Sequence, residues 1–312
     1  ATPGSTPVAS EKQGHPQREQ KQHALPNLSD FFDRTKPWVL VPDGSYNGFF
    51  DWVPEKLRHG PWSIVAVLYL PLIVITITAG VLWAYIRPQD DWSWKDESNG
   101  MYPETGSLHW CYNTFIFIWI SFLNYQLFAD FGMRPWTYYT MWSWTALWIR
   151  HGLSALSPLF SHSQILKLCL ESLRFPCLAT ASITFLVWNL VLLPGGLFLV
   201  RTKGAKKKEI ILKAAFSWKL VQLHIFNICY AIINCVFTSP VRLLNYNDFA
   251  AAAVQALAYI LWYLCVMDRL GLHPYPVFSP RTPWCLLSWS MILVCHTGLF
   301  LFWNNILDMV GN

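Results

Sequence analysis

Long apolar runs separated by short polar segments dominate the pattern of this chain. Seven runs of about twenty residues carry few charges, and a helix of that length crosses the hydrocarbon core of a bilayer. The runs are Trp62–Ile86, Leu108–Phe128, Trp136–Leu156, Phe175–Val200, Phe216–Phe237, Phe249–Met267 and Thr282–Trp303. Tryptophans cluster at their ends, as in the aromatic belts of membrane proteins. The pattern predicts an all-α, polytopic membrane helix bundle of about seven transmembrane helices.

Composition supports this class. Of the 312 residues, 54% are hydrophobic and only 13% are charged, which is too apolar for an ordinary soluble domain. The eight cysteines lie mostly inside the runs and form no CxxC pair, so they resemble small apolar core residues. His296 lies roughly 20 Å into the last run, too deep to share a haem with a histidine nearer the other end. We therefore expect neither a metal nor a cofactor.

Charge along the loops predicts the orientation. The loop between the fourth and fifth runs is strongly basic, whereas the loop after the first run is acidic, so seven spans place the two loops on opposite sides. The basic residues are Arg201, Lys203, Lys206, Lys207, Lys208 and Lys213. Lys206, Lys207 and Lys208 either mark the cytoplasmic or equivalent side or bind anionic lipid headgroups. The net charge of +5 is mostly this asymmetry, and no nucleic acid partner is predicted.

The N-terminal segments differ in composition. Residues 1–29 are rich in Gln, Pro, Ser and His and predict a disordered or partner-bound tail. Residues 30–61 mix aromatic residues with Pro and charges, which suits an arm lying on the membrane interface. Residues 62–86 form an additional span before the helical core at 108–305. The first residue, Ala1, fits either a processed precursor of a mitochondrial or other organellar membrane or a cloning fragment, and both stay open.

A polar stripe follows the fifth run. His224, Asn227 and Asn234 lie three and ten residues apart, and such spacings place them on one helix face. Polar groups at bilayer depth need partners, so we expect this face to point into the bundle. An ionisable residue inside a membrane span is a functional hypothesis by default.

A second stripe in the third run joins Thr137, Thr140 and Trp144. Both runs enter from the same side, and a rise of 1.5 Å per residue places Thr140 roughly 6 Å and His224 roughly 9 Å inside the interface. The hydroxyl and the imidazole are thus expected at similar depth.

A hydroxyl beside an imidazole suits nucleophilic acyl transfer. The histidine would take the hydroxyl proton while the oxygen attacks an ester carbonyl, and Asn227 would orient the ring. The alternative is structural, because membrane threonines usually bond to their own backbone and a buried His–Asn pair often only joins two helices. Both interpretations remain open at this point.

Other polar residues have simpler interpretations. Glu171 and Arg174 are spaced to pair on an interfacial helix turn. His151, beside Arg150, is expected at the interface opposite His224. Arg242 would cap the far end of the fifth run or meet a lipid phosphate.

Several short motifs resemble a known family. They are Asn124-Tyr125, Trp136 to Thr140, Trp218 with His224, Pro240 with Arg242, Ala258 to Trp262, Gly271 and Tyr275-Pro276. Together they are similar to the androgen-induced-protein (FAR-17a/AIG1-like) membrane family over about 108–305, with further similarity to rolling-stone-like relatives. That family includes hydrolases of fatty acid esters of hydroxy fatty acids. The resemblance implies that Thr140 and His224 form the catalytic pair.

The chain departs from that family in two respects. The family core has six spans, so the run at 62–86 and the N-terminal arm are additions, and Val221 stands where the hydrolases often have a second histidine. Two functions are therefore expected as alternatives. One is a threonine-type lipid ester hydrolase acting on fatty acyl esters of membrane lipids. The other is a non-catalytic structural or lipid-binding accessory subunit of a larger membrane complex, which contacts other membrane subunits through the arm and first span.

Overall fold

The computed structural model describes residues 104–199, 205–238, 242–267 and 285–311, together with Leu72, Tyr275 and Phe278. Every regular element in these ranges is helical. The predicted tail at 1–29 and arm at 30–61 lie outside the described residues, as does the run at 62–86 apart from Leu72.

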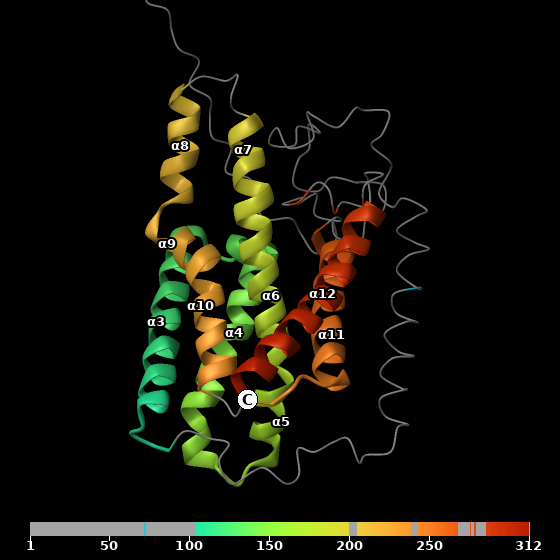
Figure 1. Ribbon diagram of the computed structural model, residues 1–312. Coiled ribbons are helices and arrows are strands. Elements are labelled where there is room, and N and C mark those ends of the chain that lie inside the picture. Colours follow the sequence, from blue (N-terminus) through green and yellow to red (C-terminus); the bar gives the residue numbers. More distant parts are fainter. Residues whose placement is uncertain are drawn as a thin grey trace, which may run out of the picture.

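The helices form a bundle (Figure 1). Its α-helices are α3 (Leu108–Phe131), α4 (Tyr139–Leu156), α5 (Gln164–Ser172), α6 (Arg174–Val187), α7 (Leu193–Leu199), α8 (Ala205–Ala215), α9 (Trp218–Val221), α10 (Asn227–Ile232), α11 (Tyr246–Trp262) and α12 (Cys285–Gly311). Between them lie two 3-10 turns, η5 (Arg134–Thr137) and η6 (Ser157–Phe160). Four π-helical segments complete the set: η7 (Trp188–Leu192), η8 (Gln222–Phe226), η9 (Ile233–Phe237) and η10 (Tyr263–Met267).

Four helices in the described ranges are long and apolar enough to cross a membrane. They are Leu108–Phe131, Gln164–Gly195, Trp218–Phe237 and Leu287–Gly311. The predicted helical bundle is therefore confirmed, and the fold is compatible with an integral membrane protein. The predicted count of seven spans is not established, because the first run lies outside the described residues and α4 and α11 are not among these four.

Helix α6 is the centre of the bundle. All its side chains from Arg174 to Thr184 are buried, and α4, α10, α11 and α12 pack around it. Figure 1 shows α12 crossing obliquely past α6 and α11. Small residues such as Ala179, Ala181 and Ser182 allow these neighbours to approach closely, which is how membrane helices associate without a hydrophobic driving force between them.

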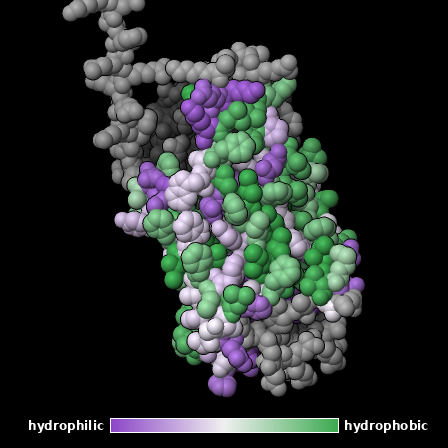
Figure 2. Space-filling model, turned by 60° about the vertical axis from the view of Figure 1, so that its left-hand side comes forward, coloured by the Kyte–Doolittle hydropathy of each residue, from purple (hydrophilic) through white to green (hydrophobic). Residues whose placement is uncertain are grey.

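The surface of α3 points outward. Phe115, Ile118 and Phe122 are exposed, whereas Ile116, Ile120 and Leu123 are buried against the core. Figure 2 shows hydrophobic residues over the middle of the face that carries α3 and hydrophilic residues near its two ends. This distribution is the one expected for a surface that contacts lipid tails in its middle and headgroups at its ends.

Candidate functional site

The side chains of Thr140 and His224 meet inside the bundle. The Thr140 Oγ1 atom lies 3.4 Å from His224 Nε2, and both residues are buried. The other ring nitrogen, Nδ1, donates to the Leu220 carbonyl oxygen at 3.0 Å, one helical turn earlier. Because Nδ1 carries the proton, Nε2 is the free acceptor and faces the hydroxyl. The predicted proximity of the pair is confirmed, and its catalytic role stays a prediction.

Thr140 belongs to the first turn of α4. The 3-10 turn η5 ends at Thr137, and an extended Tyr138 then begins the helix. The backbone N–H groups of the first turn of a helix have no carbonyl four residues earlier to bond, so they are available to a ligand or a side chain. The threonine hydroxyl therefore lies beside unpaired helical N–H groups as well as beside the imidazole.

Three π-helical segments build the rest of the site. His224 lies on η8, Trp188 on η7 and Tyr263 on η10. The Trp188 indole stacks on the His224 imidazole with ring centroids 3.9 Å apart and planes inclined by 19°. Single π turns inside α-helices occur frequently at functional sites, because the extra residue re-aims the side chains around it. Trp188 thus fixes the face of the imidazole while Leu220 fixes its edge.

A small cavity opens beside the pair, with a volume of about 60 Å³. It is lined by Tyr139, Thr140, Ile183, Thr184, Val187, Trp188, Leu192, His224, Tyr259, Ile260, Tyr263, Tyr275, Phe278, Trp289 and Ile292. The lining is mostly aromatic and aliphatic. The fully buried Trp144 donates to Asn124 Oδ1 at 3.1 Å and does not block the cavity. The volume suits an ester group or a few waters, with longer chains extending beyond it.

Several hydroxyl groups converge on this apolar cavity. The Tyr139 and Thr184 hydroxyls are buried without a hydrogen-bond partner among the described residues. Burial raises the pKa of the Tyr275 phenol above its ordinary value, and hydrogen bonds from the Thr140 hydroxyl and the backbone N–H groups of Tyr139 and Thr140 oppose that rise. Unpaired hydroxyls in an apolar cavity are costly unless a ligand satisfies them.

The residues predicted to support the pair lie elsewhere. Asn227 donates to Ser143 Oγ at 3.1 Å, so Leu220 and not Asn227 orients the imidazole. The Thr137 carbonyl oxygen accepts a hydrogen bond from the Tyr259 hydroxyl at 3.1 Å, and Thr137 precedes α4 instead of continuing its stripe. The expectation that His224, Asn227 and Asn234 face the bundle interior is confirmed, because all three are buried.

Asn234 belongs to a second polar cluster near the other end of the bundle. Its side chain hydrogen-bonds Asn113, Ser154 and Arg150. Arg150 and His151 are fully buried, contrary to the expectation that they lie at an interface. The reason is that Asn234 and the Leu170 carbonyl oxygen accept from Arg150, while Asn113 pairs with His151 at 2.9 Å.

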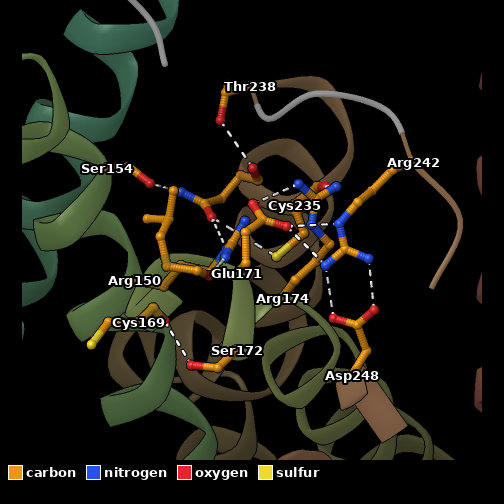
Figure 3. Close-up of polar contacts among 12 residues, drawn as sticks. Arg150, Ser154, Cys169, Glu171, Ser172, Arg174, Cys235, Thr238, Arg242 and Asp248 are labelled. Carbon is orange, nitrogen blue, oxygen red and sulfur yellow. Dashed lines mark hydrogen bonds and ion pairs between the residues drawn. The ribbon is translucent and has the colours of Figure 1, made fainter. Parts of the chain in front are cut away.

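Figure 3 shows the ionic part of this cluster, where two carboxylates join three guanidinium-bearing segments. Glu171 binds Arg174 at 2.8 Å and Arg242 at 2.8 Å. Arg242 also grips Asp248 with both terminal nitrogens, at 2.7 and 2.9 Å. The predicted Glu171–Arg174 pair is confirmed, but it is buried and not interfacial. Asp248 completes a capping box with Asn245 at the start of α11, so the cluster fixes where that helix begins.

Two predicted headgroup sites differ in the structure. Burial by itself lowers the pKa of the Arg242 guanidinium, but Asp248 and Glu171 outweigh it and raise the pKa above its ordinary value. Arg242 is thus committed to two carboxylates, and it joins α11 to the core instead of lying open to a phosphate. Lys206, Lys207 and Lys208 lie on α8, where Lys208 is exposed. Their contact with lipid headgroups stays a prediction.

Within the described ranges, no group of three or more His, Cys, Asp or Glu side chains is placed to hold a metal ion. No protein-family model matches the chain, and neither the curated proteins nor the solved structures contain a significant match. The function must therefore be argued from the site itself.

Trp188, Tyr139 and Thr184 were not predicted from the sequence. Each is an ordinary residue of an apolar segment, and nothing local indicates that it faces a histidine from another helix. Tyr275 was available as part of the Tyr275-Pro276 motif, although its contact with Thr140 was not.

Proposed function

We propose that this chain is an intramembrane ester hydrolase in which Thr140 is the nucleophile and His224 the general base. The observation that carries the proposal is the 3.4 Å contact between Oγ1 and Nε2 beside an apolar cavity. The distance is at the long end of hydrogen bonding, and catalytic hydrogen bonds often tighten only when substrate binds. The imidazole tautomer already leaves Nε2 free to accept the threonine proton.

The reaction follows the acyl-transfer pattern. Nε2 takes the Thr140 proton as Oγ1 attacks the ester carbonyl carbon, and the carbonyl oxygen becomes negatively charged. The intermediate then releases the alcohol, which receives the proton from His224, and leaves an acyl-threonine. A water, deprotonated by His224, attacks this ester and releases the fatty acid, so both residues return to their starting state.

The developing oxyanion has donors nearby. The N–H groups of Tyr139 and Thr140 lie in the first turn of α4, and at present they bond to the Tyr275 phenol oxygen. In the proposed mechanism the substrate oxygen takes the place of the phenol at these groups. Preorganised backbone donors of this kind are typically the largest single contribution to such catalysis.

Fatty acyl esters are the substrate class that fits the surroundings. The cavity is lined mainly by aromatic and aliphatic side chains and lies among membrane-compatible helices, so the substrate would enter sideways from the lipid. The hydroxyl groups of Tyr139 and Thr184 offer hydrogen bonds to the two ester oxygens. We also propose that the chain is a relative of the androgen-induced-protein family, with seven spans in a mitochondrial or other organellar membrane.

A fluorophosphonate probe for serine and threonine hydrolases tests the proposal. The purified full chain should be labelled at Thr140, identified by mass spectrometry of the modified peptide. Thr140→Ala should abolish labelling, and Thr297→Ala is the matched control because the Thr297 hydroxyl bonds to the Leu293 carbonyl oxygen on an exposed face of α12. Labelling that survives both Thr140→Ala and His224→Ala would refute the hydrolase.

The second candidate is a non-catalytic structural or lipid-binding accessory subunit of a larger membrane complex. The small volume of the cavity, about 60 Å³, favours it. The N-terminal arm and the first span would then contact neighbouring membrane subunits. Purification from the native membrane distinguishes the two, because an accessory subunit co-purifies in fixed stoichiometry with partners and is not labelled by the probe.

A further inference from the structure

A second, larger recess lies between α4 and α11. Both helices pack on α6 and α5, and the groove between them has a volume of about 600 Å³. Each wall is a stripe with spacings of three, four and seven residues, so each is one helix face. The α4 wall is Trp142, Thr145, Ala146 and Ile149, and the α11 wall is Ala251, Val254, Gln255 and Ala258. Small alanines on both walls leave the space open.

The groove is distinct from the ester cavity. The Tyr259 ring packs edge-on against Tyr139, with centroids 5.1 Å apart, and against Trp142, with centroids 5.5 Å apart. Tyr139 and Tyr259 line the ester cavity, whereas Trp142 lines the groove. This aromatic contact separates the two spaces, so a ligand of the groove does not reach Thr140.

Two oxygens within this groove lack hydrogen-bond partners. Thr145 Oγ1 and Gln255 Oε1 are shielded from solvent, and neither bonds to any residue that the structure describes. Other hydroxyls of the bundle bond to the carbonyl four residues earlier, as Ser121, Thr180 and Thr238 do at 2.7, 2.7 and 3.1 Å. Thr145 departs from this usual arrangement of membrane threonines. Leaving both oxygens unpaired at bilayer depth is costly, so a ligand that pairs with them would bind favourably.

The dimensions of the groove limit the occupant. From Trp142 to Ile149 the α4 wall is about 10 Å long, whereas a membrane-spanning partner helix needs an apolar stripe of about 30 Å. The volume lies within the range of about 300–1,000 Å³ that is typical of small-molecule sites. One hydroxyl group on an otherwise apolar ligand both accepts from Thr145 and donates to Gln255, whereas a plain acyl chain satisfies neither.

We propose that this groove binds a lipid alcohol, a ligand with a single hydroxyl on an apolar body. The hydroxyl lies between Thr145 and Gln255, and the apolar body lies along the alanine-lined walls. This site is independent of the proposed hydrolase activity.

Photocrosslinking of the full chain in phosphatidylcholine nanodiscs tests the site. The probe is hexadecanol with a diazirine at mid-chain, and its methyl ether is the comparison because it cannot donate to Gln255. Crosslinks mapped by mass spectrometry should gather on the α4 and α11 walls. One lost hydrogen bond should reduce them about fivefold for the ether, for Thr145→Val and for Gln255→Leu.

Matched variants keep the result interpretable. Thr297→Val, the same change on an exposed face of α12, and Thr140→Ala should both leave the crosslinks unchanged, the latter whether or not the chain is a hydrolase. Ala251→Phe should fill the groove and abolish the wall crosslinks, with folding checked by thermal unfolding. Equal labelling by the alcohol and the ether, or labelling spread evenly over α3 and α12, would overturn the proposal. Crosslinks from the groove to another polypeptide in native membranes would overturn it as well.

Discussion

Replacing Trp188 should slow the hydrolase by acting on the imidazole that it covers. During acyl transfer His224 becomes an imidazolium, and the indole lies over it with centroids 3.9 Å apart. A cation over a tryptophan face gains about 0.5–1 kcal/mol at exposed sites and about 2 kcal/mol when it is desolvated. Because His224 is only 7% exposed, the larger value applies. Trp188→Leu should therefore lower kcat by roughly 30-fold, since about 1.4 kcal/mol corresponds to a factor of ten.

Long-chain 4-nitrophenyl esters in detergent micelles provide the assay. Trp188→Phe retains an aromatic face with a weaker charge distribution, so kcat should fall by only about threefold. KM should change little in either variant, because the interaction forms in the transition state and not on substrate binding. If Leu and Phe reduce kcat equally, or if KM alone changes, the stacked indole does not stabilise the imidazolium.

Three further predictions concern other parts of the chain. Glu171→Gln leaves buried arginines without their carboxylate and should lower the free energy of unfolding by about 3–5 kcal/mol, whereas Glu209→Gln, in an exposed pair, should change it by less than about 0.5 kcal/mol; thermal unfolding in detergent measures both. Thr140→Ser keeps a hydroxyl nucleophile and should retain probe labelling, and its loss would show that the threonine methyl group positions the oxygen. Serine at positions 206–208 should reduce the number of anionic lipids retained in native mass spectrometry, and an unchanged number would leave these lysines as orientation determinants only.

The Thr140–His224 contact was predictable because helix geometry and topology determine it. Two spans that enter from one side place residues at similar depth, and a stripe of buried polar residues indicates which face points inward. Those two arguments need only spacing and charge. Both residues proved to be buried in the bundle and 3.4 Å apart.

The features that shape the site were not predictable. A π-helical segment changes the hydrogen-bond register of the backbone by one residue, and no composition of the segments around Trp188 and His224 indicates that change. The ring therefore faces Leu220 and Trp188, although the spacing had favoured Asn227. Buried Arg150 was wrongly placed at an interface because its acceptors, Asn234 and the Leu170 carbonyl oxygen, come from distant parts of the sequence. Partners of buried charges depend on tertiary packing, which a periodic pattern does not encode.

Hydrolysis of a fatty acyl ester by the purified chain, with Thr140→Ala as its partner, tests the central claim most directly. The acid released from a radiolabelled long-chain ester is followed in liposomes, and a covalent acyl group is sought on the Thr140 peptide after rapid quenching. The account predicts turnover by the native chain, a loss of about 10³-fold or more in Thr140→Ala, and an acyl-threonine at position 140. Equal turnover by the native chain and Thr140→Ala, or no turnover and no acyl adduct in a folded native chain, would contradict it.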